Sequence, residues 1–108
     1  MKLLLPLALL PFLAPQEPAA KVHTALAPAE RLAEGWWKER FEATNKRLAQ
    51  GDVGLLFLGD SITQGWEGEG KAVWDEFFAP RKAVNLGFSG DRTQHVLWRL
   101  ERHGLEAL

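Results

Sequence analysis

The segment Val53-Gly54-Leu55-Leu56-Phe57-Leu58-Gly59-Asp60-Ser61 combines a short apolar run with a glycine turn that ends on a serine. The run, residues 53–58, shows no alternation of apolar and polar positions, so it suits a strand buried on both faces, as in a parallel sheet. A second short strand is predicted over residues 83–86, and it also leads into a glycine turn, Gly87-Phe88-Ser89-Gly90. Two strands separated by helical sequence indicate an α/β fold with a parallel sheet.

A long amphipathic helix is predicted before the first strand, from Pro28 to a stop signal at Gly51. Its apolar positions recur in steps of three and four residues, which places them on one helix face. We interpret the adjacent Trp36 and Trp37 as packing anchors against the sheet rather than as a ligand platform. The predicted inner face consists of Ala33, Trp37, Phe41, Thr44 and Leu48, with Leu32 and Trp36 at its margin.

Two shorter helices complete the pattern. The first is predicted over residues 71–78 and ends before Pro80, which cannot continue a helix. Its inner side should hold Val73, Trp74 and Phe77. The second follows the Gly90 turn, where Asp91 can act as the cap and Gln94, three residues later, completes a capping box. It should end at Gly104 and turn three residues toward the core, Val96, Leu97 and Leu100.

The N-terminus predicts export. A positive start, Met1-Lys2, precedes the uncharged apolar run of residues 3–13. About a dozen residues are too few to span a bilayer, which needs about 20, but they suit the core of a secretory signal peptide. We therefore expect a signal peptide over residues 1–20, a Pro/Ala-rich linker over 21–29 and a secreted or periplasmic product. A buried helix is the alternative, and the prolines inside the run argue against it.

Composition excludes several classes of function. The chain has 108 residues, and its 13 basic and 14 acidic side chains give a net charge of −1. This balance gives no reason to expect nucleic acid or an anionic membrane surface as a partner. The absence of cysteine excludes disulfides, thiolate catalysis and cysteine-ligated zinc. It also makes a lipid anchor after the apolar run unexpected, so no stable membrane anchor is predicted.

The two glycine turns follow strands, and in open parallel sheets ligands bind beyond the carboxyl ends of the strands. Ser61 occupies the first such position and Gly90 the second. A serine on a sharp turn presents its hydroxyl and its N–H, and a glycine on the neighbouring turn can bring a second N–H close. Two converging N–H groups would stabilise the oxyanion of acyl transfer. From the residues alone, an anion-binding turn with Ser61 as a helix cap is equally compatible.

Two longer blocks resemble a known family. Residues 58–66, Leu-Gly-Asp-Ser-Ile-Thr-Gln-Gly-Trp, are similar to the first sequence block of the GDSL, or SGNH, hydrolases. Residues 85–100, which begin Asn-Leu-Gly-Phe-Ser-Gly-Asp-Arg-Thr-Gln-His, are similar to the second block. The likeness is greatest to the branch that contains the platelet-activating-factor acetylhydrolase catalytic subunits and their bacterial relatives. It extends over about residues 36–108.

The resemblance implies a flavodoxin-like three-layer α/β/α fold and ester hydrolysis without a metal or an organic cofactor. By position, Ser61 matches the nucleophile and the first oxyanion donor, and Gly90 matches the second donor. The family's third donor is an Asn in a Gly-Thr-Asn turn after the third strand, and its base is a His in an Asp-x-x-His motif. Neither motif occurs in these 108 residues. We therefore expect residues 30–108 to be the N-terminal portion of an SGNH hydrolase domain, truncated before the third strand.

The three histidines present do not replace that base in our interpretation. His95 belongs to the helix after Gly90 and is expected to be structural. His103 lies near the far end of that helix and is expected to be too far from Ser61 to act on it, and His23 falls in the linker. Asp60 is expected to hold its turn by hydrogen bonding. Trp66, close to the serine turn, either shapes the mouth of a pocket or packs.

The predicted function is a secreted serine esterase that acts on a small-molecule or carbohydrate ester, through short-chain acyl or O-acetyl hydrolysis. The alternative is a non-catalytic truncated product, or a module that binds a ligand or partner through an exposed sheet edge. The oligomeric state is not fixed by the sequence.

Overall fold

The computed structural model describes residues 2–4, 6, 8, 11, 14–15 and 20–108. Much of the predicted signal peptide, residues 1–20, lies outside the described residues. Within the described ranges, no helix combines the length and the apolar character needed to cross a bilayer.

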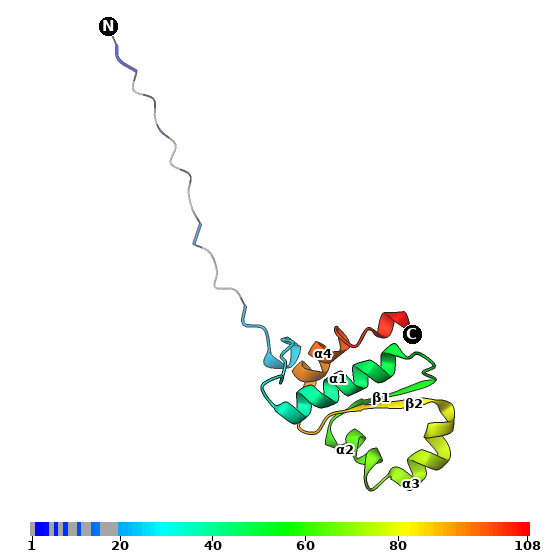
Figure 1. Ribbon diagram of the computed structural model, residues 1–108. Helices are drawn as coiled ribbons and strands as arrows, with labels where there is room; N and C mark the ends of the chain where they lie inside the picture. The colour runs from blue at the N-terminus through cyan, green and yellow to red at the C-terminus, as the bar shows by residue number, and fades with distance from the viewer. Residues whose placement is uncertain (1, 5, 7, 9–10, 12–13, 16–19) are drawn as a thin grey trace.

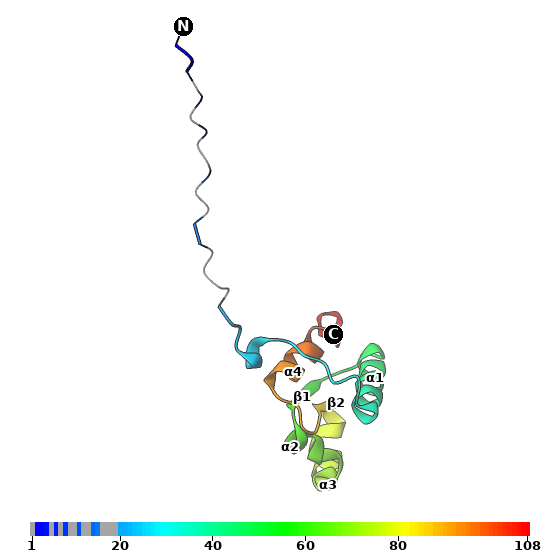
Figure 2. The ribbon, with the colours of Figure 1, turned by 90° about the vertical axis from the view of Figure 1, so that its left-hand side faces the viewer.

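Two parallel strands form the centre of the α/β fold, as predicted. β1 (Leu55–Gly59) pairs with β2 (Ala83–Gly87) in a register that places Leu55 opposite Ala83 and Gly59 opposite Gly87. The carboxyl ends of both strands, and the turns that follow them, therefore lie side by side. Figure 1 shows the helices α1 and α4 on one side of the strands and α2 and α3 on the other, and Figure 2 shows the same layers from the side.

The two strands differ in burial, which corrects the prediction for β1. Residues 84–87 of β2 are buried, whereas β1 is only partly buried and Leu58 is 44% exposed. The apolar run of β1 does form a parallel strand, but in the described part of the chain β1 is paired along one edge only. The lack of alternation therefore predicted the strand correctly, but it overestimated how far other elements bury it.

α1 (Gly35–Ala49) covers one face of the strands. Its inner face agrees with the predicted one, since Trp37 and Leu48 are buried and Phe41 and Thr44 are partly buried. Ala33 is not part of this face, because the helix begins at Gly35 rather than near Pro28. The residues before it form instead an N-terminal arm (residues 24–34), which includes a 3₁₀ turn over Thr24–Leu26.

Successive residues of each strand face opposite sides of the sheet and pack against different partners. On the α1 side, Leu48 packs with Val84 and Leu86 of β2 in the apolar core. On the opposite side, Phe57 of β1 meets an aromatic cluster that the connection between the strands provides. The members of that cluster are Trp66, Trp74 and Phe78.

The predicted helix over residues 71–78 is wound differently. It divides into α3 (Lys71–Val73), a π-helical turn (Trp74–Phe78) and a 3₁₀ turn (Ala79–Arg81). The wider π winding turns Phe78 onto Phe57, with ring centroids 4.9 Å apart, and turns Phe77 outward. The prediction of Val73 and Phe77 as inner residues was therefore wrong, and Trp74 was correct.

α4 (Thr93–Leu100) begins later than its predicted cap. Arg92, not Asp91, occupies the N-cap position, and the ring of His95, not Gln94, accepts a hydrogen bond from the Arg92 N–H. The fully buried residue of α4 is Arg99, while the three predicted core residues are partly buried. Regular helix ends at Leu100, and the chain reaches Gly104 in a left-handed conformation, φ +68°.

Candidate active site

Ser61 lies at the first position of α2 (Ser61–Gln64), a one-turn helix directly after β1. The Asp60 carboxylate accepts a hydrogen bond from the Ile62 N–H at 3.0 Å, which confirms its predicted role in holding the turn. Gly59 permits the sharp reversal, because a Cβ there would overlap the Thr63 hydroxyl. The turn leaves Ser61 exposed beyond the carboxyl end of β1.

β2 and the turn after it fix the position of α2. The Asn85 side chain donates to the Thr63 carbonyl at 2.8 Å and accepts from the Gly87 N–H at 2.8 Å. Gly87 lies so close to α2 that a Cβ would overlap the backbone of Thr63 and Gln64. Gln64 in turn accepts from the Ser89 N–H at 2.7 Å. Sequence reasoning missed Asn85 and Gln64, whose contacts span more than 20 residues of chain.

The second turn comprises Phe88–Asp91 and closes through a hydrogen bond from the Asp91 N–H to the Phe88 carbonyl at 3.1 Å. Gly90 has φ +76° at the third position of this turn, where a type II turn requires a residue that tolerates positive φ. Among the hydrogen bonds of the described residues, none has the N–H of Ser61 or of Gly90 as its donor. Both groups are therefore free to bind an oxyanion, and their roles as donors stay predictions.

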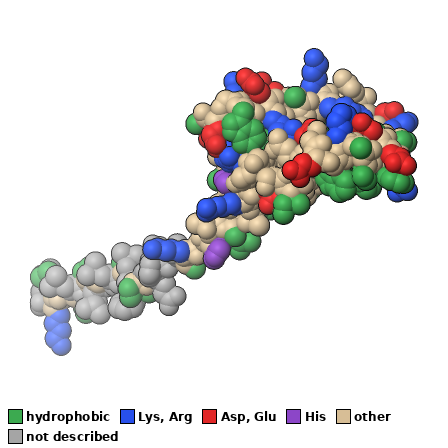
Figure 3. Space-filling view, turned by 90° about the horizontal axis from the view of Figure 1, so that it is seen from below, with side chains coloured by type: hydrophobic (Ala, Val, Ile, Leu, Met, Phe, Trp, Pro, Cys, Tyr) green, Lys and Arg blue, Asp and Glu red, His purple; other side chains and the backbone are tan. Residues whose placement is uncertain are grey.

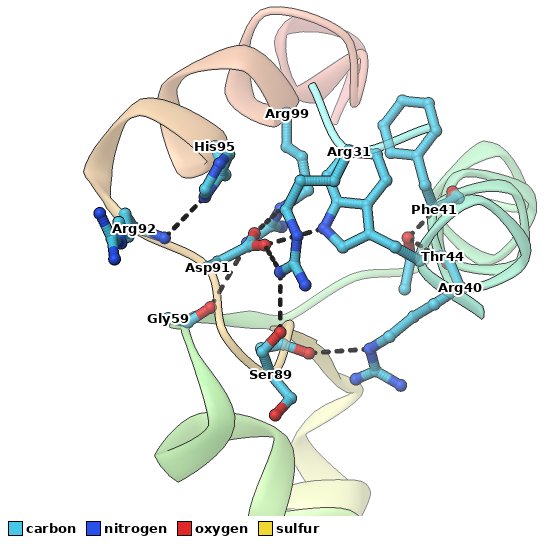
Figure 4. A network of polar contacts seen from close by, with 12 residues as sticks. Arg31, Arg40, Phe41, Thr44, Gly59, Ser89, Asp91, Arg92, His95 and Arg99 are labelled. Atoms are coloured by element: carbon cyan, nitrogen blue, oxygen red, sulfur yellow. Dashed lines mark hydrogen bonds and ion pairs between the residues drawn. The ribbon is translucent and has the colours of Figure 1, made fainter. Parts of the chain in front are cut away.

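A buried ion cluster lies beneath the two turns (Figure 4). Asp91, whose side chain is fully buried, accepts hydrogen bonds from Arg31 (2.7 Å) and Trp37 (2.8 Å) on one oxygen. Its other oxygen accepts from Arg99 Nε at 2.8 Å. The prediction that Asp91 caps α4 was wrong, because two guanidinium groups and an indole bind its carboxylate instead.

Arg99 links this cluster to the serine turn. Its Nη2 donates to the Gly59 carbonyl at 3.4 Å, and its guanidinium lies 3.9 Å from the centroid of the Phe88 ring. Burial lowers the pKa of Arg99, and the hydrogen bond to Asp91 acts in the opposite direction. A second arginine, Arg40 of α1, donates to the Gly87 carbonyl at 2.8 Å and pairs with Glu67. Sequence analysis identified neither arginine.

His103 is buried and neutral. Its Nε2 lies 3.1 Å from Arg99 Nη1, and since a guanidinium can only donate, Nε2 is the acceptor. The proton is then on Nδ1, which donates to Asn45 Oδ1 at 2.6 Å. Burial, and after it the charge of Arg99, lowers the pKa of His103 to about 4. With both ring nitrogens engaged, His103 is not available as a base for Ser61.

The other two histidines also have local partners. His95 Nδ1 accepts from the Arg92 N–H at 2.8 Å, and burial lowers the pKa of His95. His23 Nδ1 accepts from the Ala25 N–H at 3.1 Å. In the described part of the chain the Ser61 hydroxyl has no hydrogen-bond partner, so none of the three histidines serves it as a base.

A shallow pocket of about 350 Å³ opens beside the serine and is lined by Ser61, Ile62, Gly65, Trp66, Glu69 and Gly70. Trp66 fulfils both interpretations offered for it, because it lines this pocket and packs edge-on against Phe78 at 5.3 Å. On the side of the molecule where α2 and α3 lie, the surface shows exposed apolar side chains among charged ones (Figure 3). The exposed apolar side chains of the segment that joins the strands include Ile62 and Phe77.

The fold and these turns together define an α/β protein with a candidate acyl-transfer site. No protein-family model matches the chain. Over 52 residues the chain is 48% identical to the platelet-activating factor acetylhydrolase IB subunit alpha1 of Homo sapiens and of Rattus norvegicus. It is 46% identical to the alpha2 subunit of Homo sapiens over the same length.

These matches cover 48% of this chain and 22% of each relative, so the chain spans about a fifth of the length of the curated relatives it matches. The names of these homologues support a hydrolase function.

Proposed function

We propose that this chain is the N-terminal part of a secreted serine ester hydrolase of the GDSL/SGNH type. The observation that carries the proposal is the pair of turns at adjacent strand ends, with the N–H groups of Ser61 and Gly90 both free of hydrogen bonds within the described residues. The similarity to acetylhydrolase subunits supports the same class of reaction.

In this mechanism the Ser61 hydroxyl oxygen attacks the ester carbonyl carbon. The N–H groups of Ser61 and Gly90 stabilise the resulting oxyanion, and a histidine takes the serine proton and passes it to the leaving alkoxide. Water then hydrolyses the acyl-serine to release the acid. Because His23, His95 and His103 have structural partners, we place this histidine, its aspartate and the third oxyanion donor beyond residue 108.

We infer a small-molecule or carbohydrate ester as the substrate, with a short acyl group such as acetyl. The pocket beside Ser61 is shallow, and Trp66 offers it an aromatic wall. The relatives are named acetylhydrolases. Export to the periplasm or medium follows from the predicted signal peptide, and no nucleic-acid partner or membrane anchor is part of the proposal.

The test is turnover by the full-length gene product on acetylated sugars and nitrophenyl esters. We expect acetyl-ester hydrolysis that Ser61→Ala abolishes, with a loss of several orders of magnitude, because a nucleophile has no substitute. Ser89→Ala is the matched control, since Ser89 is exposed on the neighbouring turn. Absence of turnover on every acetyl ester would refute the substrate class, and full activity of the Ser61→Ala variant would refute the nucleophile.

A binding module is the second candidate, favoured by the exposure of Leu58 and the single pairing of β1 in the described part of the chain. A fluorophosphonate probe separates the two candidates on the full-length product. Labelling that requires Ser61 supports the hydrolase, whereas a product that binds a partner but is never labelled supports the module.

A further inference from the structure

We propose that Arg31, in the N-terminal arm, is a positioning residue that orients the Gly90 N–H toward the substrate. This inference rests on the proposed function, because it assigns a purpose to the oxyanion donor of that same site. Arg31 itself touches no reacting atom. It acts through the peptide unit that joins Ser89 to Gly90.

Arg31 contacts the residues immediately before and after Gly90 in the sequence. Its Nη1 donates to the Ser89 carbonyl at 2.8 Å and to Asp91 Oδ1 at 2.7 Å (Figure 4). A Cβ added to Gly90 would lie 3.3 Å from Arg31 Nη2, so the guanidinium packs directly against the glycine. One side chain therefore contacts all three residues from Ser89 to Asp91.

The planar geometry of the peptide bond means that this contact also sets the direction of the Gly90 N–H. The Ser89 carbonyl and the Gly90 N–H belong to one planar trans peptide, so they point in opposite directions. In a turn with glycine at its third position, this peptide can rotate between type I and type II arrangements, since glycine tolerates both signs of φ. The hydrogen bond from Arg31 holds the Ser89 carbonyl pointed toward the N-terminal arm. The N–H of Gly90, at the other end of the same peptide unit, then points away from the arm.

Arg31 is itself held in place before it meets the turn. Glu34 accepts from Arg31 Nε at 2.6 Å and from Nη2 at 2.9 Å, a bidentate pair that fixes the guanidinium plane. The Trp36 ring centroid lies 5.2 Å from the guanidinium carbon, and the Arg31 side chain is only 14% exposed. The arm is also fastened to α4, because the Ala29 N–H donates to the Gln94 carbonyl at 3.1 Å.

Substitution of Arg31 in the full-length gene product tests the proposal. In Arg31→Ala the peptide is free to rotate, so we expect kcat for acetyl-ester hydrolysis to fall about 10- to 100-fold with KM within about two-fold, since loss of a whole oxyanion donor costs about 100- to 1,000-fold in kcat. Arg31→Lys keeps a charged donor but loses the planar guanidinium that donates several hydrogen bonds at once, so it should recover part of kcat. Guanidinium ion added to the alanine variant should also restore part of it.

The matched control is Arg47→Ala. Arg47, like Arg31, donates to loop carbonyls, here those of Gly51 and Asp52, but at the far end of α1 from the Gly90 turn. It should leave kcat within about two-fold of the wild-type value. If Arg31 merely stabilised the fold, the two alanine variants would match in kcat once both were shown to be folded, and that result would overturn the proposal.

A readout independent of activity separates this inference from the proposed function. The Asp91 N–H closes the turn on the Phe88 carbonyl, so its amide hydrogen exchange reports on turn order. We expect exchange at Asp91 to accelerate at least about 10-fold in Arg31→Ala and to stay unchanged in Arg47→Ala. If the wild-type protein hydrolyses no ester, the proposed function fails while this measurement still decides whether Arg31 orders the turn. If Arg31→Ala does not fold, the same measurements on Arg31→Lys decide, and unchanged exchange and kcat there would contradict the positioning role.

Discussion

Asp91 shows how a single charge organises the site at the residue scale. Its carboxylate is fully buried and is compensated by two arginines and the Trp37 indole. These partners come from the N-terminal arm, α1 and α4, so one side chain joins three segments beneath the Gly90 turn (Figure 4). A buried charge with this many partners is stable only while all of them remain.

Asp91→Asn should therefore destabilise the protein strongly. The amide has nearly the same shape but leaves the buried Arg99 guanidinium without its counter-charge, and breaking a buried pair costs about 3–5 kcal/mol. Urea unfolding of the two proteins measures the difference. Asp52→Asn is the control, because Asp52 pairs with Lys82 on the surface and its loss should change little. A change no larger than that of the control would contradict the role of Asp91.

His103 predicts a dependence of stability on pH. Its pKa is lowered to about 4 in the folded protein, from an ordinary value of 6.5 in the unfolded chain. Between these values the unfolded chain binds more protons, so stability is lost as pH falls from about 6.5 to about 4, in total about 3 kcal/mol. Below pH 4 both states are protonated and this contribution stops changing.

Unfolding free energies at a series of pH values between 4 and 7.5 test this. His103→Gln should reduce the slope over that window, although it also removes the contacts with Asn45 and Arg99. His23→Gln, an exposed histidine, should leave the slope as it is. A slope that survives in His103→Gln would show that another group titrates.

At the scale of elements, the connection between the strands depends on its π-helical turn. In this turn Phe78 packs on Phe57 and Trp66, whereas the adjacent Phe77 is 55% exposed. The regular helix predicted from the sequence would instead turn Phe77 toward the sheet, with Val73 and Trp74.

Adjacent alanine substitutions test this winding. Phe78→Ala should cost about 2–3 kcal/mol, somewhat less than a fully buried phenylalanine, because it opens the aromatic cluster against β1. Phe77→Ala removes an exposed ring and should cost less than about 1 kcal/mol. Thermal or urea unfolding of both variants measures the difference, and a larger loss of stability for Phe77→Ala than for Phe78→Ala would contradict the π-helical turn and favour the regular helix.

At the scale of the whole molecule, the site is assembled from parts that lie far apart in the sequence. Arg31 reaches the turn that follows β2, 58 residues away, and Trp37 reaches Asp91 across 54 residues. The arm therefore belongs to the folded unit, although the sequence suggested a linker up to residue 29 and a helix beyond it. Even within the predicted linker, Ala29 is hydrogen bonded to α4.

The sequence by itself determined the two parallel strands, the helices around them and the placement of Ser61 and Gly90 on turns at adjacent strand ends. These follow from local rules, because apolar runs form strands, glycines permit sharp turns and the carboxyl ends of parallel strands share an edge. Only the tertiary structure decided that Asp91 is a buried anchor and not a cap, that Phe78 replaces Phe77 in the core, and that Arg31 holds the Gly90 turn. Each of these depends on burial and on partners brought together by packing, and no local pattern around a residue records what the rest of the chain places against it.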